Sequence, residues 1–242
     1  RLFSFWWLGS SYQEGRRWLV EALRDGERLA RDERVACHAV LALITTMELE
    51  NRFSMEHATR AIDLAAGRAS PFLVIALSVR AFGTSVLAAL PGADPRLAAD
   101  ARRDAAAAVA VTRPGLPAEW REFAQLFCAM IETNLGDVRA AAGWWTALVE
   151  TCGLAEEAGW LLPMALAGLA VSQHLLGETD EALRAAFRVR ALPDLLAGPL
   201  MWVRTSTLVE VTPALVAGGQ EEVACQALRD AARDVCRVGI PL

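Results

Sequence analysis

The sequence predicts an all-α protein built from about six antiparallel helix pairs, and two observations carry this prediction. Helix-period apolar patterns run almost continuously along the 242 residues, and no segment shows sustained strand-like alternation. Short turn signals interrupt these patterns; one residue taken from each turn, at positions 9, 51, 92, 136, 177 and 219, gives intervals of 42, 41, 44, 41 and 42 residues. So regular a period predicts a single repeat domain over residues 1–242.

The turns share a local pattern that explains how each pair forms. They are Gly9-Ser10, Asn51-Arg52, Pro91-Gly92, Leu135-Gly136-Asp137, Leu176-Gly177-Glu178 and Gly218-Gly219. Glycine can take the left-handed conformation that closes a helix. An alanine follows the glycine by five positions in three turns, at Ala141, Ala182 and Ala224. Its small side chain lets the second helix of a pair pack close to the first.

The turns and the prolines set the expected helix positions. The first helices of the pairs are expected near residues 2–9, 31–50, 71–90, 118–135, 157–176 and 200–217. The second helices are expected near residues 12–26, 54–67, 95–111, 137–152, 179–191 and 220–237. Ser70-Pro71 and Pro114-Gly115-Leu116-Pro117 mark two links between pairs, since proline is tolerated in a first helical turn.

Composition excludes several classes of function. The formal net charge is −5 and no lysine occurs, so the chain lacks the basic face that a phosphate backbone requires, and we expect no direct nucleic-acid binding. The five cysteines form no CxxC motif and lie in apolar helical contexts. We therefore expect them to be reduced, small hydrophobic side chains in a cytoplasmic protein. Most of the eight tryptophans are expected to fill gaps between helix pairs with their large aromatic side chains.

One stretch is long enough to span a bilayer. Twenty uncharged residues lie between Glu157 and Glu178. This stretch also contains Pro163, Gly168 and His174, and it falls in register with the repeats. We therefore expect a buried repeat helix and no membrane association.

The element Gly-x-x-x-x-Ala, with an apolar residue before the glycine, resembles the tetratricopeptide repeat, whose unit is about 34 residues. This resemblance implies a right-handed superhelix, an α-solenoid. The longer unit seen here is similar to the helical-repeat region of large ATP-binding bacterial transcription regulators, the maltose-regulator and LuxR-type group of signal-transducing NTPases. Phe5-Trp6-Trp7-Leu8-Gly9 and Glu14-Gly15-Arg16-Arg17-Trp18-Leu19 resemble the start of this region in actinobacterial members.

The resemblance implies a function in signal transduction. In that family the repeats act as a sensor arm, which receives a small ligand or a partner protein and controls an ATPase. A nucleotide-binding module and a winged helix precede the arm. The chain has no GxxxxGK[ST] loop, so we expect no cofactor in this segment and ATP binding only in an upstream domain of a longer chain.

No motif indicates an enzyme or a metal site. The three histidines, His38, His57 and His174, are expected on three different repeats, where they would not converge on a metal. The sequence contains no HExxH, GxSxG or DDxxD element. Glu156-Glu157 and Glu221-Glu222 are expected at helix starts, where carboxylates favour the positive end of the helix dipole.

The tetratricopeptide register predicts which side chains line a concave groove. These positions lie three, six, ten and thirteen residues before each turn residue: His38, Leu41, Thr45 and Glu48; Phe123, Leu126, Met130 and Thr133; Met164, Ala167, Val171 and His174. A mostly apolar lining favours a small hydrophobic effector or an amphipathic helix as the occupant. Two alternatives stay open: the stripe is core, or the chain is a general protein–protein adaptor without a small ligand. Apolar faces on the end repeats also predict a homo-oligomer.

Overall fold

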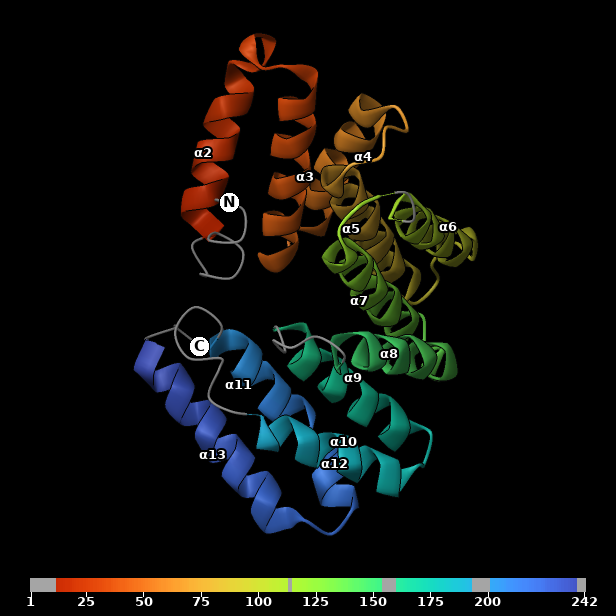
Figure 1. Cartoon of the computed structure of the whole chain (residues 1–242), viewed down its shortest axis with the longest axis vertical. Coiled ribbons are helices and arrows are strands. Elements are labelled where there is room, and N and C mark those ends of the chain that lie inside the picture. The colour runs from red at the N-terminus through yellow and green to blue at the C-terminus, as the bar shows by residue number, and fades with distance from the viewer. Residues whose placement is uncertain (1–11, 113–114, 154–159, 193–200, 239–242) are drawn as a thin grey trace. The chain divides into compact units, whose positions relative to one another are not determined.

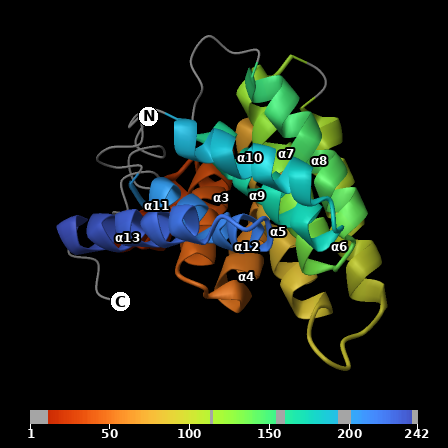
Figure 2. The same ribbon diagram turned by 90° about the horizontal axis from the view of Figure 1, so that it is seen from below.

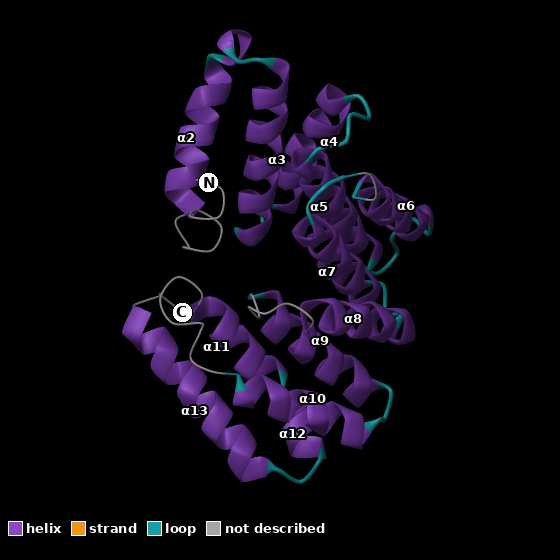
Figure 3. Cartoon of the chain, viewed as in Figure 1, coloured by secondary structure: helices purple, strands orange, loops and turns teal. Residues whose placement is uncertain are grey.

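The computed structural model describes residues 12–112, 115–153, 160–192 and 201–238, and these residues form helices joined by short turns (Figure 3). Across the described ranges no residue lies in a β-strand. The prediction of an all-α chain is therefore confirmed. The helix expected at residues 2–9 lies outside the described residues.

The chain divides into two compact units, Arg1–Gly136 and Asp137–Leu242. The first contains α2 (Tyr12–Arg24), the 3-10 turn η1 (Gly26–Arg28), α3 (Arg31–Met47), α4 (Asn51–Ala65), α5 (Pro71–Ala88), α6 (Arg96–Val111) and α7 (Ala118–Asn134). The second contains α8 (Val138–Gly153), α9 (Leu161–Leu175), α10 (Thr179–Ala191), α11 (Met201–Glu210), α12 (Thr212–Ala217) and α13 (Glu221–Val238) (Figure 1).

Helices within each unit pack mainly on their neighbours in the chain. In the first unit every helix from α2 to α7 contacts the next one, and α5 also contacts both α3 and α7. In the second unit α9 contacts α8, α10 and α11, while α13 packs on α11 and α12. Packing between adjacent helices, and between alternate ones, is expected where helix pairs repeat along the chain.

The glycine turns form largely as predicted. Gly92, Gly136, Gly177 and Gly219 have φ angles of 78°, 75°, 78° and 71°, in the left-handed region. The turn expected at Asn51-Arg52 differs, because Asn51 begins α4 and Leu49 takes the left-handed conformation with φ 61°. Ala141, Ala182 and Ala224 are all buried, so small side chains occupy the interior at these repeated positions.

The helix expected at 200–217 is divided in two. α11 ends at Glu210 and α12 begins at Thr212, with Pro213 in its first turn. Proline has no backbone N–H to donate to the preceding turn, and its ring clashes with the carbonyl four residues earlier. The apolar periodicity of the sequence continues across the break between Glu210 and Thr212, and for this reason the sequence predicts a single helix.

Apolar burial concentrates on the first helices of the pairs. In α5 the side chains of Val74, Ile75 and Val79 are fully buried. This is the helix in the described ranges that is long and apolar enough to cross a membrane, and 61% of it is buried inside the protein. The uncharged stretch between Glu157 and Glu178 forms α9, which has 15 residues.

The cysteines do not all behave as buried hydrophobic side chains. Cys128 and Cys152 are buried and Cys37 is half-buried, but Cys225 and Cys236 are exposed on α13. The prediction of an apolar context was therefore wrong for these last two. Alanine and valine neighbours make the sequence around them look apolar, whereas α13 turns both thiols away from α11 and α12.

Three buried carboxylates tie neighbouring helices together. Asp104 on α6 accepts two hydrogen bonds from Arg80 on α5, with N–O distances of 2.7 and 2.9 Å. Glu132 on α7 is paired with Arg102 on α6, and Asp234 on α13 with Arg204 on α11. A buried carboxylate without its partner is strongly destabilising, so these pairs help to fix which helices are neighbours.

Two glycines provide a direct test of helix packing in the second unit. A Cβ built on Gly168 of α9 would lie 2.3 Å from an indole carbon of Trp145 on α8, whereas a Cβ on Gly143 of α8 has open space around it. We expect Gly168→Ala to lower the free energy of unfolding by about 1–3 kcal/mol because the buried indole must shift.

Gly143→Ala is the matched control. Alanine favours the helix over glycine by about 1 kcal/mol, so this variant should be more stable than the parent chain. Urea denaturation followed by circular dichroism measures both effects. Equal stability changes in the two variants would contradict the close packing of α9 on α8.

Candidate interaction groove

An open groove lies along α2 in the first unit. Its volume is about 650 Å³, within the range of small-molecule and peptide sites. α2 contributes Gln13, Arg16, Arg17, Val20, Glu21 and Arg24, and the end of α3 and the turn after it contribute Glu48 and Glu50. α2 and α3 run side by side and are joined through η1, so the groove is built from local structure (Figure 1).

The spacing of residues on α2 separates its two faces. Leu19 and Gly15 are four residues apart and buried, with Leu19 in the cluster that includes Val40 and Ile44 of α3. Gln13, Arg17, Val20 and Arg24 recur at three- and four-residue intervals and therefore share the groove face. The "EGRRWL" segment thus places its leucine inward and its second arginine in the groove.

Arg16 connects the groove wall to two other helices. Its guanidinium lies 2.8 Å from Glu48 and donates bonds of 2.7 and 3.0 Å to the two carboxylate oxygens of Glu50. It also lies 5.2 Å above the ring of Phe53 on α4. The hydrogen bond with Glu50 is the main cause that raises the pKa of Arg16 above its usual value. This side chain therefore positions α2 and stays charged.

The remaining groove chemistry is polar and balanced in charge. Three arginines and three glutamates stand among the eight lining residues. Glu21 and Arg24 pair with each other at 2.6 Å, and the Arg17 guanidinium lies 5.4 Å above the ring of Trp18. Trp18 itself is 54% exposed and is not among the residues that line the groove. Exposed tryptophan and arginine are the residue types most enriched at the energetic centres of protein interfaces.

Next to the groove, α3 and α4 bring two histidines into contact. Nδ1 of His38 lies 2.7 Å from Nδ1 of His57, and their stacked ring centroids are 5.0 Å apart. Phe53 packs edge-on against His57. The expectation that the histidines lie on separate repeats was wrong for this pair, because α3 and α4 form one hairpin. In the described residues no three metal-binding side chains converge.

The histidine pair is held in its neutral form. Burial, followed by the charges of His57, Arg60 and Arg34, lowers the pKa of His38 to about 4. Burial is also the main cause that lowers the pKa of His57, with Arg60 and Arg16 acting in the same direction and Glu56 opposing them. An Nδ1–Nδ1 hydrogen bond needs one donor and one acceptor, so two fully protonated rings cannot keep this contact.

The sequence-predicted groove residues fall into three groups. His38, Leu41, Thr45, Phe123 and Leu126 are buried, as is Ala167. Glu48, Met130, Met164, Val171 and His174 are partly exposed, and Thr133 is exposed. Glu48 is the member of this set that lines the groove described above. The binding role predicted for the others stays a prediction.

Arg16, Arg17 and Glu50 are the main groove residues that the sequence did not indicate. The register rule considers the first helix of each pair, whereas this groove is dominated by α2, which was expected to be a second helix. The sequence signal that could have indicated the groove is the alternation of charged residues at three- and four-residue spacing on α2.

No protein-family model matches the chain, and no curated protein matches it. The resemblance to the sensor region of ATP-dependent regulators therefore stays a prediction.

The histidine pair predicts a stability that depends on pH. The unfolded histidine titrates near 6.5, whereas His38 in the fold titrates near 4, so the unfolded chain binds more protons between these values. The contribution of His38 to the free energy of unfolding is therefore largest above pH 6.5, and it is lost as the pH falls towards 4. We expect a loss on the order of 2 kcal/mol between pH 7 and 4.5.

Urea denaturation at a series of pH values measures this effect. A variant with both His38→Leu and His57→Leu should lose the part of the pH dependence that lies between pH 4 and 6.5. If the parent and the double variant show the same pH profile, the histidines are not held neutral by the fold.

Proposed function

We propose that the chain is an effector-sensing and protein-interaction domain of an ATP-dependent transcription regulator and is not an enzyme. The observation that carries this proposal is the groove along α2, which charged side chains line and whose Arg17 lies over the exposed ring of Trp18. The proposed architecture is a tetratricopeptide-like, right-handed solenoid of about six helix pairs. Neighbour-to-neighbour helix packing in each unit supports it.

In the proposed role, ATP is bound by another domain of a longer protein and not by this segment. ATP binds in an upstream domain, and this segment transmits the presence of an effector or partner to it in the cytoplasm. The absence of a phosphate-loop motif in the sequence supports this division of labour. The acidic net charge of −5 supports a segment that does not itself contact nucleic acid.

Two occupants are proposed for the concave surface, a small hydrophobic effector or a partner helix. In the first unit the partly exposed Met130 favours the first occupant, since methionine adapts to varied apolar ligands. The groove along α2 favours the second. Arg17, which lies over the Trp18 ring, can pair with an acidic side chain of a helix, while Val20 and the neighbouring Trp18 supply apolar contact.

The charge pattern also supports a second function, a general protein–protein adaptor without a small ligand. Such an adaptor would use the groove for peptides alone. A thermal-shift screen with small hydrophobic molecules, alongside a screen with amphipathic helical peptides of mixed charge, separates the two functions. Stabilisation by peptides alone supports the adaptor, and stabilisation by small molecules supports the sensor.

A charge reversal locates peptide binding in the groove. Arg17→Glu should weaken the affinity for a selected peptide by about tenfold or more, because it replaces an attractive contact with a repulsive one. Arg96→Glu is the matched control, since Arg96 is an exposed arginine at the start of α6 and does not line the groove. Calorimetric titration gives both affinities. Equal losses in the two variants would show that the peptide responds to net charge and not to the groove.

A further inference from the structure

Leu49 has a backbone conformation that the corresponding turns of the other described helix pairs give to glycine. Its φ angle is 61°, in the left-handed region. At the other described turns within pairs, the residues with positive φ are Gly92, Gly136, Gly177 and Gly219. A side chain makes this conformation costly, whereas glycine adopts it freely. Leucine at position 49 therefore strains a turn that glycine would form without strain.

The turn at Leu49 has the same hydrogen bonds as a glycine turn. The N–H of Leu49 donates to the carbonyl three residues earlier, as the N–H of Gly177 does. In both turns the next N–H donates to the carbonyl five residues before it. These bonds close the preceding helix and involve the backbone alone. Glycine at position 49 would therefore leave the turn unchanged.

Burial does not compensate for the strain at Leu49. Its side chain is 84% exposed, so it gains little of the free energy that a buried leucine contributes. Single exposed leucines are common on protein surfaces, but they rarely occupy a left-handed position. Strained backbone that the rest of the fold does not compensate is typical of residues that contact a ligand or a partner.

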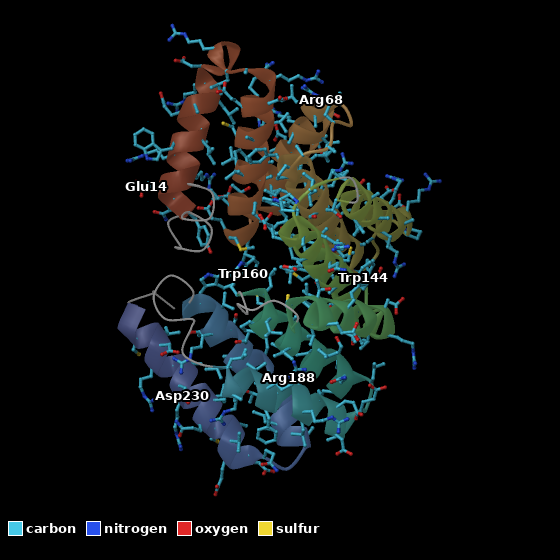
Figure 4. The ribbon with its side chains drawn as sticks, in the orientation of Figure 1. Glu14, Arg68, Trp144, Trp160, Arg188 and Asp230 are labelled. Carbon is cyan, nitrogen blue, oxygen red and sulfur yellow. The ribbon has the colours of Figure 1, made fainter. Side chains whose placement is uncertain are left out.

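Leu49 lies at the rim of the groove along α2. Its neighbours in the chain, Glu48 and Glu50, both line the groove and both bind Arg16. The turn joins α3 to α4, which lie side by side in Figures 1 and 2. The start of α2, which Glu14 marks in Figure 4, lies at the same end of this hairpin because Arg16 reaches both glutamates.

The charges of the groove indicate what can bind beside Leu49. Two of the three groove arginines are held by glutamates of the groove itself. Arg17 is exposed over the ring of Trp18 and forms no ion pair within the described part of the chain. Its guanidinium is therefore the groove charge that is left to attract a carboxylate.

We propose that Leu49 is a specificity-determining contact for a partner helix in this groove. The helix carries an apolar side chain that meets Leu49 and a carboxylate that pairs with Arg17. Leu49 and Arg17 are each one residue away from the ion pair at Arg16, so the two groups of the partner lie within about one helical turn of each other. This inference rests on the partner-helix function proposed above.

Two substitutions measure the cost of leucine in this turn. Leu49→Gly should raise the urea midpoint of the full chain, because glycine relieves the strain and little burial is lost. Gly177→Leu should lower the midpoint. A Cβ at Gly177 has open space around it, so only the backbone conformation opposes the leucine.

Either of two results from these variants would overturn the proposal. A lower midpoint for Leu49→Gly would show that contacts within the chain hold the leucine in place. An unchanged midpoint for Gly177→Leu would show that leucine costs nothing at such a turn, and the exposed side chain would then need no partner to explain it.

Calorimetric titration measures the contact itself. The probe is the amphipathic helical peptide that gives the largest thermal shift with the parent chain. Leu49→Gly should weaken its affinity by about tenfold. Leu175→Ala is the matched control, since Leu175 is a 61% exposed leucine beside a glycine turn of the second unit, and it should leave the affinity unchanged.

A glutamine scan of the peptide's carboxylates tests the pairing with Arg17. One substitution, within about one helical turn of the apolar contact, should weaken binding to the parent chain but not to Arg17→Gln, because the variant has already lost the pair. If every glutamine substitution has the same effect on both proteins, the carboxylate does not bind Arg17 and the proposed partner is wrong.

The outcomes separate the contact from the function on which it rests. A peptide that binds the parent chain and Leu49→Gly equally well would overturn the role of Leu49 and leave peptide binding in place. Stabilisation by small hydrophobic molecules alone, or by no probe at all, would instead overturn the partner-helix function and this contact with it.

Discussion

The close approach of helices through small side chains is the constraint on which the architecture depends. Alanines at 141, 182 and 224 are buried at equivalent positions, and Gly168 leaves the space that the indole of Trp145 fills. Each close approach of this kind joins one helix to a neighbour in the chain. Within each unit, the helix contacts therefore join mainly elements that are close in the chain.

Polar interactions within this apolar framework decide which helices are neighbours. Buried Asp104 is satisfied by Arg80, so α5 and α6 cannot separate without leaving a buried charge unpaired. Arg16 performs a related task at the surface, where it joins α2 to the end of α3 and to Phe53 of α4. The interactions of Arg16 hold the groove in shape, because Glu48 and Glu50, which bind Arg16, also line the groove.

Much of the fold follows from sequence because helix periodicity and glycine turns are local signals. The left-handed glycines at 92, 136, 177 and 219 are where the repeat predicts them. The break at Pro213 was missed because the apolar pattern runs through it. The groove was harder to predict, since it depends on which side of α2 meets α3, and periodicity alone does not give that orientation.

The contact between His38 and His57 illustrates a further limit. Both histidines occur in ordinary helix-forming sequence, and their pairing depends on the rotation of α3 against α4. Exposure of Cys225 and Cys236 depends similarly on the orientation of α13. The buried alanines of α13 face α11 and α12 and fix that orientation. The two thiols are exposed because they lie on the other side of the helix.

The central claim is that helix pairs are stabilised by their neighbours and not by one common centre. Circular dichroism and urea denaturation of the chain ending at residue 136, the end of the first compact unit, test this claim most directly. The account predicts a helical protein that unfolds cooperatively without the second unit. A largely unfolded chain, or a helical one that unfolds without cooperativity, would contradict it.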